Sequence, residues 1–396
     1  MNMPAPTPAL SVENLLECAS AAAGGLRNFG SDNYREALGV LLAALAEEAC
    51  LSPQGQQMLH DKLVSQLVNR LVMEDYLARH PEILQQPIED PLVIVGLPRT
   101  GTTMLQRTLA VDPRLYSAAW WETRYPAPLE GESLAEPRRR LELACAEVEM
   151  MRQVIPQILA IHPLDAMLAD EEFMLMEHSF MCAMDAYVNV PSYTRWLDGQ
   201  DQRPVYMQLK KMLQFLQWQK TRRGVPAAQR WLLKAPQHLH TLELLLEVFP
   251  KAQIILTHRD PAKTIPSMAS MAHTLWQMYS DEPDPRVVGE QWNSRMARAI
   301  RHAMQVRDQT APERFLDIRF EDTVRNPLGV LEAVYAFAGI PFTEEVRGAM
   351  QQWLANNTRE TRAAHDYSLE RFGLSEQQME RDYADYRRRH IAEAAA

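Results

Sequence analysis

The sequence predicts an α/β fold of three layers, in which helices cover both faces of a central parallel sheet. Two observations support this prediction. Short apolar runs that suit buried strands alternate along the chain with stretches in which apolar residues recur at helical spacing. The first of these runs leads through a glycine turn into a helical stretch, and strands that alternate with helices form parallel sheets.

The chain divides into two expected regions. Apolar residues at helical spacing between about residues 11 and 80 predict a helical N-terminal region. Segment 81–91 carries three prolines and three acidic residues and suits a linker. We therefore expect an N-terminal helical region with its linker at residues 1–90 and an α/β domain at residues 91–396.

The α/β domain contains four expected strands and a helical insertion. The apolar runs predict strands at 92–95, 231–233, 254–257 and 315–318. Helical spacing predicts helices at 102–111, 239–248 and 329–338. The stretch from about 134 to 216 is expected to be a mainly helical insertion, broken by Pro156, Pro163 and Pro191, that binds the acceptor.

Composition restricts the class of protein. The formal net charge of -10 and the pI near 5.6 argue against a nucleic-acid-binding surface, which needs many contacts from Lys and Arg to phosphates. The four cysteines have neither CxxC pairs nor zinc-type spacing, so we expect free thiols and no metal. The chain shows no signal peptide and no apolar run of about 18 residues, which predicts a cytoplasmic protein without a membrane span.

The most informative segment runs from Gly96 to Thr103, with the sequence Gly-Leu-Pro-Arg-Thr-Gly-Thr-Thr. It lies between the strand expected at 92–95 and the helix expected at 102–111, and its two glycines have the spacing of a nucleotide P-loop. The backbone N–H groups of such a turn bind a phosphate at the start of the helix. The segment therefore predicts a P-loop-like fold with a local anion site.

One position separates this loop from that of an ATP-using enzyme. The Walker pattern has a Lys directly after its second glycine, to reach the β- and γ-phosphates, and Thr102 stands there instead. The basic residue comes earlier, at Arg99, where it suits the leaving oxygen of a donor with a single 5′-phosphate. A P-loop kinase or NTPase is the rival prediction among enzymes.

The segment from Pro98 to Thr103 resembles the first signature of the PAPS-dependent sulfotransferases, where PAPS is 3′-phosphoadenosine 5′-phosphosulfate. A second match follows downstream, where Arg259 ends an expected strand and Ser267 stands eight positions later, like the family's Arg and Ser pair. Arg and Ser are suited to bind a phosphate dianion by hydrogen bonds. Arg319-Phe320-Glu321-Asp322 is similar to a further family segment. The resemblance covers roughly residues 92–342.

This resemblance implies a sulfotransferase that moves a sulfonate group from PAPS to a hydroxyl or amine of an acceptor, without a metal. It implies that the donor's 5′ end is bound by Arg99, Thr100, Gly101, Thr102 and Thr103. It also implies that Arg259 and Ser267 bind the 3′-phosphate and that Phe320 lies near the adenine. Arg362, His365 and Arg371 are candidates to close over the 3′-phosphate.

Sulfonate transfer needs positive charge on the sulfonate and a base for the acceptor's proton. Arg99 and Lys234 are expected to supply the charge, because Lys234 matches the strand-end Lys that contacts the sulfonate in relatives. The base is less clear, since many cytosolic members have a His two residues after that Lys and this chain has Pro236.

Two residues are candidates for the base. Trp121-Glu122-Thr123-Arg124 is similar to a segment of the tyrosylprotein sulfotransferase branch, so we favour Glu122, with a pKa raised by partial burial beside Trp120 and Trp121. An ion pair with Arg124 or with Arg99 is the alternative role of Glu122. His238 is the second candidate for the base.

The acceptor is expected to be a small, partly apolar alcohol or phenol, given the Met and Trp residues of the insertion. The acidic run Asp170-Glu171-Glu172 either contacts the acceptor or complements a helix dipole. A non-catalytic protein that binds PAPS or its product without turnover is the alternative from another functional class. The sequence makes no prediction about the oligomeric state.

Overall fold

The computed structural model describes residues 10–88, 90–155, 163–182, 184–357 and 367–391. Its centre is a sheet of five strands in the order β2-β3-β1-β4-β5, in which every pair of neighbours is parallel. The strands are β1 (Leu92–Gly96), β2 (Leu115–Tyr116), β3 (Arg230–Lys234), β4 (Gln253–His258) and β5 (Phe315–Arg319). The fold prediction is confirmed.

Alternating residues of β1 explain why the sheet is buried on both faces. Val93 and Val95 belong to a large apolar core that includes residues of the N-terminal helices. Leu92 and Ile94 point to a second core, formed with residues of the C-terminal helices. All five residues of β1 are buried, which accounts for its continuous apolar sequence.

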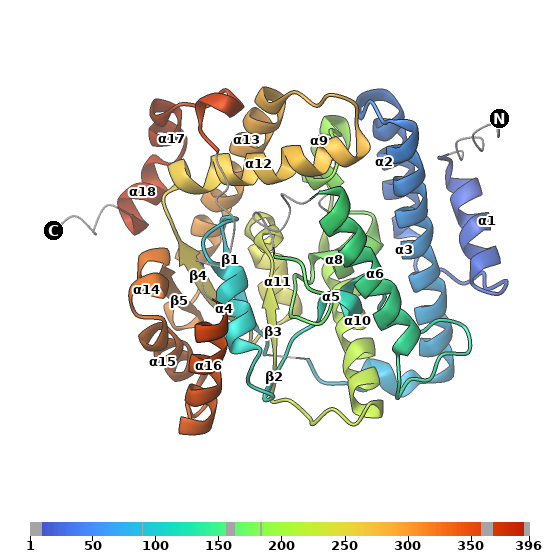
Figure 1. Cartoon of the computed structure of the whole chain (residues 1–396), viewed down its shortest axis with the longest axis horizontal. Helices are drawn as coiled ribbons and strands as arrows, with labels where there is room; N and C mark the ends of the chain where they lie inside the picture. The colour runs from blue at the N-terminus through green and yellow to red at the C-terminus, as the bar shows by residue number, and fades with distance from the viewer. Residues whose placement is uncertain (1–9, 89, 156–162, 183, 358–366, 392–396) are drawn as a thin grey trace.

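The helices before β3 form the N-terminal region and the predicted insertion. The N-terminal helices α1 (Val12–Ala22), α2 (Asn33–Glu48) and α3 (Pro53–Arg79) lead into the 3-10 turn η1 (Pro81–Gln85). The next helices are α4 (Thr102–Leu109), α5 (Trp120–Arg124), α6 (Arg138–Val154), α8 (Phe173–Met176), α9 (Pro191–Asp198) and α10 (Arg203–Arg222), with 3-10 turns η2 (Glu177–Ser179) and η3 (Met184–Ala186). In Figure 1, α1 to α3 stand to one side of the sheet.

The elements after β3 complete the helical layers. They are η4 (Pro236–His240), α11 (Leu242–Val248), α12 (Pro261–Tyr279), α13 (Pro285–Asp308), η5 (Pro312–Arg314), α14 (Phe320–Arg325), α15 (Pro327–Ala338), α16 (Glu344–Asn356), η7 (Glu370–Phe372), α17 (Glu376–Asp382) and α18 (Ala384–His390). Figure 1 shows α12 crossing from the side of α17 and α18 to the N-terminal helices. Its far end touches α3, where a Cβ on Gly55 would lie 1.9 Å from the Tyr279 carbonyl oxygen.

Most expected elements are present, with small shifts at their ends. The four expected strands are β1, β3, β4 and β5, and the structure adds β2, which has two residues. The helix expected at 239–248 is wrong in its first part, because Thr241 has an extended φ of -148° that separates η4 from α11. The division of the chain at residue 90 stays a prediction.

The carboxyl ends of the parallel strands meet at one edge of the sheet. Gly96 ends β1 in the middle, Lys234 ends β3 on one side, and Arg259 follows β4 on the other side. Open α/β sheets bind ligands at this edge. Across the described residues, no helix is both long enough and apolar enough to cross a bilayer.

Candidate active site

The loop after β1 is held in a conformation that suits a phosphate site. Gly101 has a φ of 88° and precedes the first residue of α4, and a Cβ there would lie 3.1 Å from the ring of Phe320. A Cβ on Gly96 would lie 2.2 Å from Thr257 Oγ1. Both positions therefore require glycine, and the first N–H groups of α4 have no partners within the helix.

The threonines of this loop have different positions. Thr100 is fully buried, and its hydroxyl donates to the carbonyl of Leu97 at 2.8 Å and lies 2.7 Å from Thr257 Oγ1. Thr102 is buried at the first position of α4, and Thr103 is partly exposed beside it. The hydroxyl of Thr100 thus fixes the loop, whereas Thr103 is open to a ligand.

The two sequence signatures meet in space at Arg99. Its Nε donates to Ser267 Oγ at 3.2 Å, and Arg259 Nη1 donates to the Arg99 carbonyl at 2.9 Å. Arg99 has a φ of 71°, in the left-handed region that costs a side chain about 1–2 kcal/mol. The bond from Arg259 helps to hold this strained residue in place.

Phe320 positions Arg259. The guanidinium carbon of Arg259 lies 4.0 Å from the centroid of the Phe320 ring, a cation–π contact. Phe320 begins α14 and also lies close to Gly101. The ring therefore connects the phosphate loop with the second signature, and whether it also lies near an adenine stays a prediction.

Lys234 lies on the other side of the loop. It is fully buried at the end of β3, and its Nζ pairs with Glu171 Oε1 and lies 3.4 Å from Thr103 Oγ1. Segment 169–170 is bound to α4, because Gln106 donates to the Asp170 carbonyl at 3.0 Å and Arg107 donates to the Ala169 carbonyl at 3.1 Å. Lys234, Thr103 and Glu171 are thereby brought together.

Glu171 lies in this cluster beside Lys234, and the sequence assigns it no definite role. It precedes the four-residue helix α8, and its side chain is 15% exposed, so it is open enough to meet a ligand. No spacing rule points to it. The signal available in the sequence was the run of three acids at 170–172, which is equally typical of a helix start.

The expectation of a raised pKa for Glu122 is wrong. Burial by itself would raise this pKa, but Lys220 and Arg223 outweigh that effect and hold the pKa of Glu122 below its ordinary value. Lys220 Nζ donates to its two oxygens at 2.8 and 2.6 Å, Arg223 Nη2 donates to Oε1, and the N–H of Ala119 donates to Oε2 at 3.0 Å. Both oxygens of Glu122 thus have partners.

The expected partner of Glu122 is also different. Arg124 pairs with Glu147, with Nε 2.9 Å from Oε1, and not with Glu122. A carboxylate that is almost completely buried and bound by two cations has no oxygen left for an acceptor's proton. The geometry therefore speaks against Glu122 as the base.

His238 is fully buried, and both of its ring nitrogens have partners. Its Nε2 lies 2.8 Å from Glu172 Oε1, and its Nδ1 lies 2.9 Å from the hydroxyl of Tyr206. A base must reach the proton that it removes. Burial and two occupied ring nitrogens therefore argue against His238 as the base.

Of the C-terminal candidates, only Arg371 belongs to the described residues. Arg362 and His365 fall outside the described residues. Arg371 is exposed in η7, with its guanidinium carbon 5.7 Å from the centroid of the Phe372 ring. A role of these residues over a 3′-phosphate stays a prediction.

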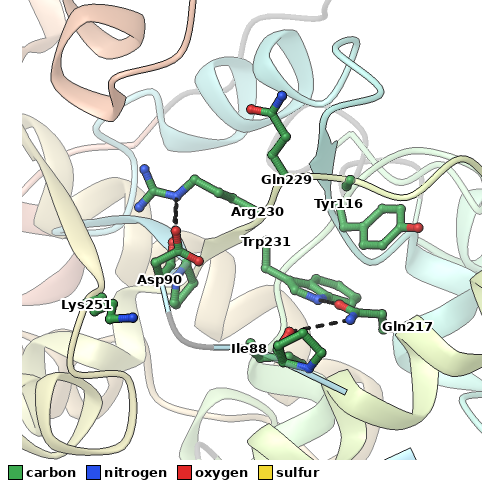
Figure 2. Close-up of a pocket in the computed structure, with 11 residues that line it drawn as sticks. Ile88, Asp90, Tyr116, Gln217, Gln229, Arg230, Trp231 and Lys251 are labelled. Atoms are coloured by element: carbon green, nitrogen blue, oxygen red, sulfur yellow. Dashed lines mark hydrogen bonds and ion pairs between the residues drawn. The ribbon is translucent and has the colours of Figure 1, made fainter. Parts of the chain in front are cut away.

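A separate cavity of about 240 Å³ lies at the amino ends of the strands, lined by residues just before β1 and at the start of β3. Figure 2 shows the side chains that line it. Arg230, the first residue of β3, pairs there with Asp90 at 3.5 Å, and Trp231 Nε1 donates to Gln217 at 2.8 Å. This cavity is therefore not part of the cluster at the carboxyl edge.

The fold and the cluster together suit an enzyme that would take a phosphorylated ligand at the carboxyl edge of its sheet. Comparison with known proteins makes this more specific. The model of the sulfotransferase family matches residues 91–344. The chain is 27% identical over 309 residues to omega-hydroxy-beta-dihydromenaquinone-9 sulfotransferase Stf3 of Mycobacterium bovis. The matched region covers 73% of this chain and 71% of that protein.

Two solved structures are similar over nearly the whole chain. Sulfotransferase STF1 of Mycobacterium tuberculosis H37Rv has a TM-score of 0.82 at 29% identity and covers 96% of this chain and 100% of its own. Sulfotransferase STF9 of Mycobacterium avium has a TM-score of 0.84 at 26% identity and covers 98% of each chain. The chain belongs to the sulfotransferase family and is a transferase of sulfonate groups, which excludes the P-loop kinase.

Proposed function

We propose that this sulfotransferase takes its sulfonate group from PAPS and transfers it to a hydroxyl of a small, lipophilic acceptor. One observation carries the choice of donor. The phosphate loop and the Arg259–Ser267 pair, two anion-binding features from different strands, are joined through Arg99. A ligand with phosphate groups at both the 5′ and 3′ positions suits such a pair of anchors, because each anchor offers donors to one dianion.

The donor site fits this ligand in its chemistry. The N–H groups at the start of α4 suit a 5′-phosphosulfate, and the partly exposed guanidinium of Arg259 with the hydroxyl of Ser267 suits a 3′-phosphate. Neither anchor needs a basic protein surface, so the proposal agrees with the net charge of -10.

We assign the chemical step to Lys234, Arg99 and Glu171. The acceptor oxygen forms a bond to sulfur while the bond from sulfur to the bridging phosphate oxygen breaks. Lys234 and Arg99 stabilise the negative charge on the sulfonate and bridging oxygens, and Glu171 accepts the acceptor's proton. Glu171 replaces Glu122 and His238 in this role because it is partly exposed beside Lys234.

The ion pair between Lys234 and Glu171 holds the proposed charge stabiliser and the proposed base next to each other. Lys234 Nζ contacts Thr103 of the phosphate loop as well as Glu171, so one ammonium group lies between the donor side and the base. An in-line transfer needs the charge stabiliser and the base on neighbouring parts of the reacting centre. This arrangement supports the assignment of all three roles.

The proposed acceptor is lipophilic for two reasons. Met174 lies three residues beyond Glu171 and, like Met151, packs against the buried cluster that contains Trp120 and Trp121. The relative Stf3 is by name a sulfotransferase of a hydroxylated menaquinone. Flexible methionine side chains adapt to irregular apolar ligands, so we extend this class of acceptor to the present chain.

The direct test is transfer of label from [³⁵S]PAPS to a series of hydroxylated acceptors. We expect a labelled sulfate ester with long-chain primary alcohols or hydroxylated isoprenoids, and none with monosaccharides at the same concentration. A protein that binds 3′-phosphoadenosine 5′-phosphate (PAP) tightly but labels no acceptor would instead be the non-catalytic binding protein.

A further inference from the structure

A buried chain of hydrogen bonds lies directly behind Lys234. It begins at Tyr206 of α10, whose hydroxyl lies 2.9 Å from His238 Nδ1. It continues from His238 Nε2 to Glu172 Oε1 at 2.8 Å. It ends where the backbone N–H of Lys234 donates to Glu172 Oε2 at 2.7 Å. Tyr206, His238 and Glu172 are between 0% and 1% exposed, so these bonds are shielded from water.

Glu172 takes the place of a missing strand neighbour. On the side away from β1, β3 is paired by β2, which contacts only Arg230 and Trp231 at the start of the strand. Within the part of the chain that the structure describes, no strand pairs with the carboxyl half of β3 on that side, and buried backbone N–H groups need another acceptor. The carboxylate of Glu172 supplies one for Lys234, and Pro236, two residues on, has no N–H of its own.

The direction of the hydrogen bonds follows from the chemistry of each group. A carboxylate only accepts, so the ring nitrogen of His238 that faces Glu172, Nε2, carries a hydrogen. Nδ1 then accepts from the hydroxyl of Tyr206. The oxygen of Tyr206 can accept in turn from Thr241 Oγ1 at 3.0 Å. Each group in the chain thus has a partner of the correct type.

We propose that Glu172, His238 and Tyr206 form a positioning relay that fixes the end of β3, and with it the place of the Lys234 ammonium group between Thr103 and Glu171. His238 is then a positioning residue and not the base. This inference rests on the proposed function, because that function gives Lys234 its task at the sulfonate. Without the relay, the Lys234 ammonium group would lose its alignment with the sulfonate.

A matched pair of variants at one position tests the relay. In His238→Gln, the side-chain amide reaches about as far as Nε2 and still donates to Glu172. In His238→Asn, the shorter amide reaches only the region of Nδ1, so Glu172 Oε1 loses the donor that His238 Nε2 supplies. Because misplacement of a reacting group by about 1 Å costs on the order of 10²-fold in rate, we expect kcat to fall about 10²-fold in His238→Asn and less than about tenfold in His238→Gln.

Two further measurements separate positioning from a general loss of structure. Calorimetric titration with PAP should give the wild-type affinity for both variants, because Arg259 and the phosphate loop are unchanged. Crystal structures should show the Lys234 ammonium displaced from Thr103 in His238→Asn and in place in His238→Gln. The structures need no turnover, so a wild-type protein that labels no acceptor would contradict the proposed function and leave the relay test intact.

The relay is overturned by any of three results. The first is a His238→Asn protein with wild-type kcat. The second is equal loss of kcat in both variants. The third is a loss of PAP affinity in parallel with kcat, which would mark His238 as a residue that only supports the fold.

Discussion

Two buried or partly buried glutamates of this protein have opposite surroundings, although each is paired with a lysine. Glu122 is about 2% exposed and is bound by Lys220, Arg223 and a backbone N–H, so its charge is fully compensated. Glu171 is 15% exposed and faces Lys234 at the carboxyl edge of the sheet. In the proposed mechanism, the same residue type therefore serves stability in one place and chemistry in the other.

This contrast predicts different effects of the same substitution. Glu171→Gln should lower kcat by about 10²-fold or more, as expected for loss of a general base, with PAP affinity unchanged. Glu122→Gln should instead lower the free energy of unfolding by about 3–5 kcal/mol, because it leaves two buried cations without their carboxylate. Steady-state kinetics and urea denaturation of both variants check this. A stable, inactive Glu122→Gln protein together with an active Glu171→Gln protein would reverse the assignment.

At the residue scale, the sequence located the site segments correctly where a motif determines the backbone conformation. The glycine spacing identified the segment 96–103, and resemblance to the family's second signature identified the pair Arg259 and Ser267. The structure brings them together at Arg99. Glu122 misled because its neighbours in sequence, two tryptophans, suggest a dry pocket, whereas its real partners stand about 100 positions away on α10. Contacts of that range leave no local pattern.

At the scale of elements, helix α18 packs against the carboxyl end of β4. His390 stacks on His258 with ring centroids 4.1 Å apart, and Arg387 pairs with Asp260 at 3.1 Å, beside Arg259. His258 Nε2 lies 2.7 Å from Asp317 Oδ1. Helix α18 thus supports the end of β4, which Arg259 follows directly.

The docking of α18 should weaken on acidification. Burial, with a smaller effect from His258, lowers the pKa of His390 to about 4. In the unfolded chain this pKa is about 6.5, so between these values the unfolded state binds more protons and stability falls as pH falls. The contribution of His390 is complete above pH ~6.5 and is lost by pH ~4.

Hydrogen exchange of the backbone amides of α18 between pH 7 and pH 4, corrected for intrinsic rates, measures this effect. We expect protection of Ala384–His390 to decrease in the wild type and to change less in His390→Gln. The comparison removes the contributions of all other titratable groups, which are present in both proteins. An equal pH slope in the two proteins would contradict the assignment.

The sequence predicted elements well where each carries its own pattern. β1, β3, β4 and β5 are apolar runs that neighbouring strands and helices cover, so their burial is visible in the sequence. β2 has two residues, Leu115 and Tyr116, too few for any periodic signal. The sequence likewise gave no sign that α12 continues through Pro266 inside the helix.

At the scale of the whole molecule, an acidic protein carries the proposed site for a strongly anionic ligand. The site combines Arg99, Lys234 and Arg259, which belong to three different parts of the sheet's carboxyl edge. Local donors and helix N–H groups suffice for this, so the net charge of -10 is no obstacle. The parallel sheet creates the site, because it places the ends of distant segments side by side.

The central claim is that two separate anchors bind the two ends of one doubly phosphorylated adenosine. Calorimetric titration of the wild type and of Arg259→Ala with PAP and with 5′-AMP tests it most directly, with the exposed Arg298→Ala as the control. The account predicts that PAP binds about 10–100-fold more tightly than 5′-AMP, that Arg259→Ala removes this difference, and that Arg298→Ala keeps it. Equal affinities of the wild type for the two nucleotides, or an unchanged PAP affinity in Arg259→Ala, would contradict it.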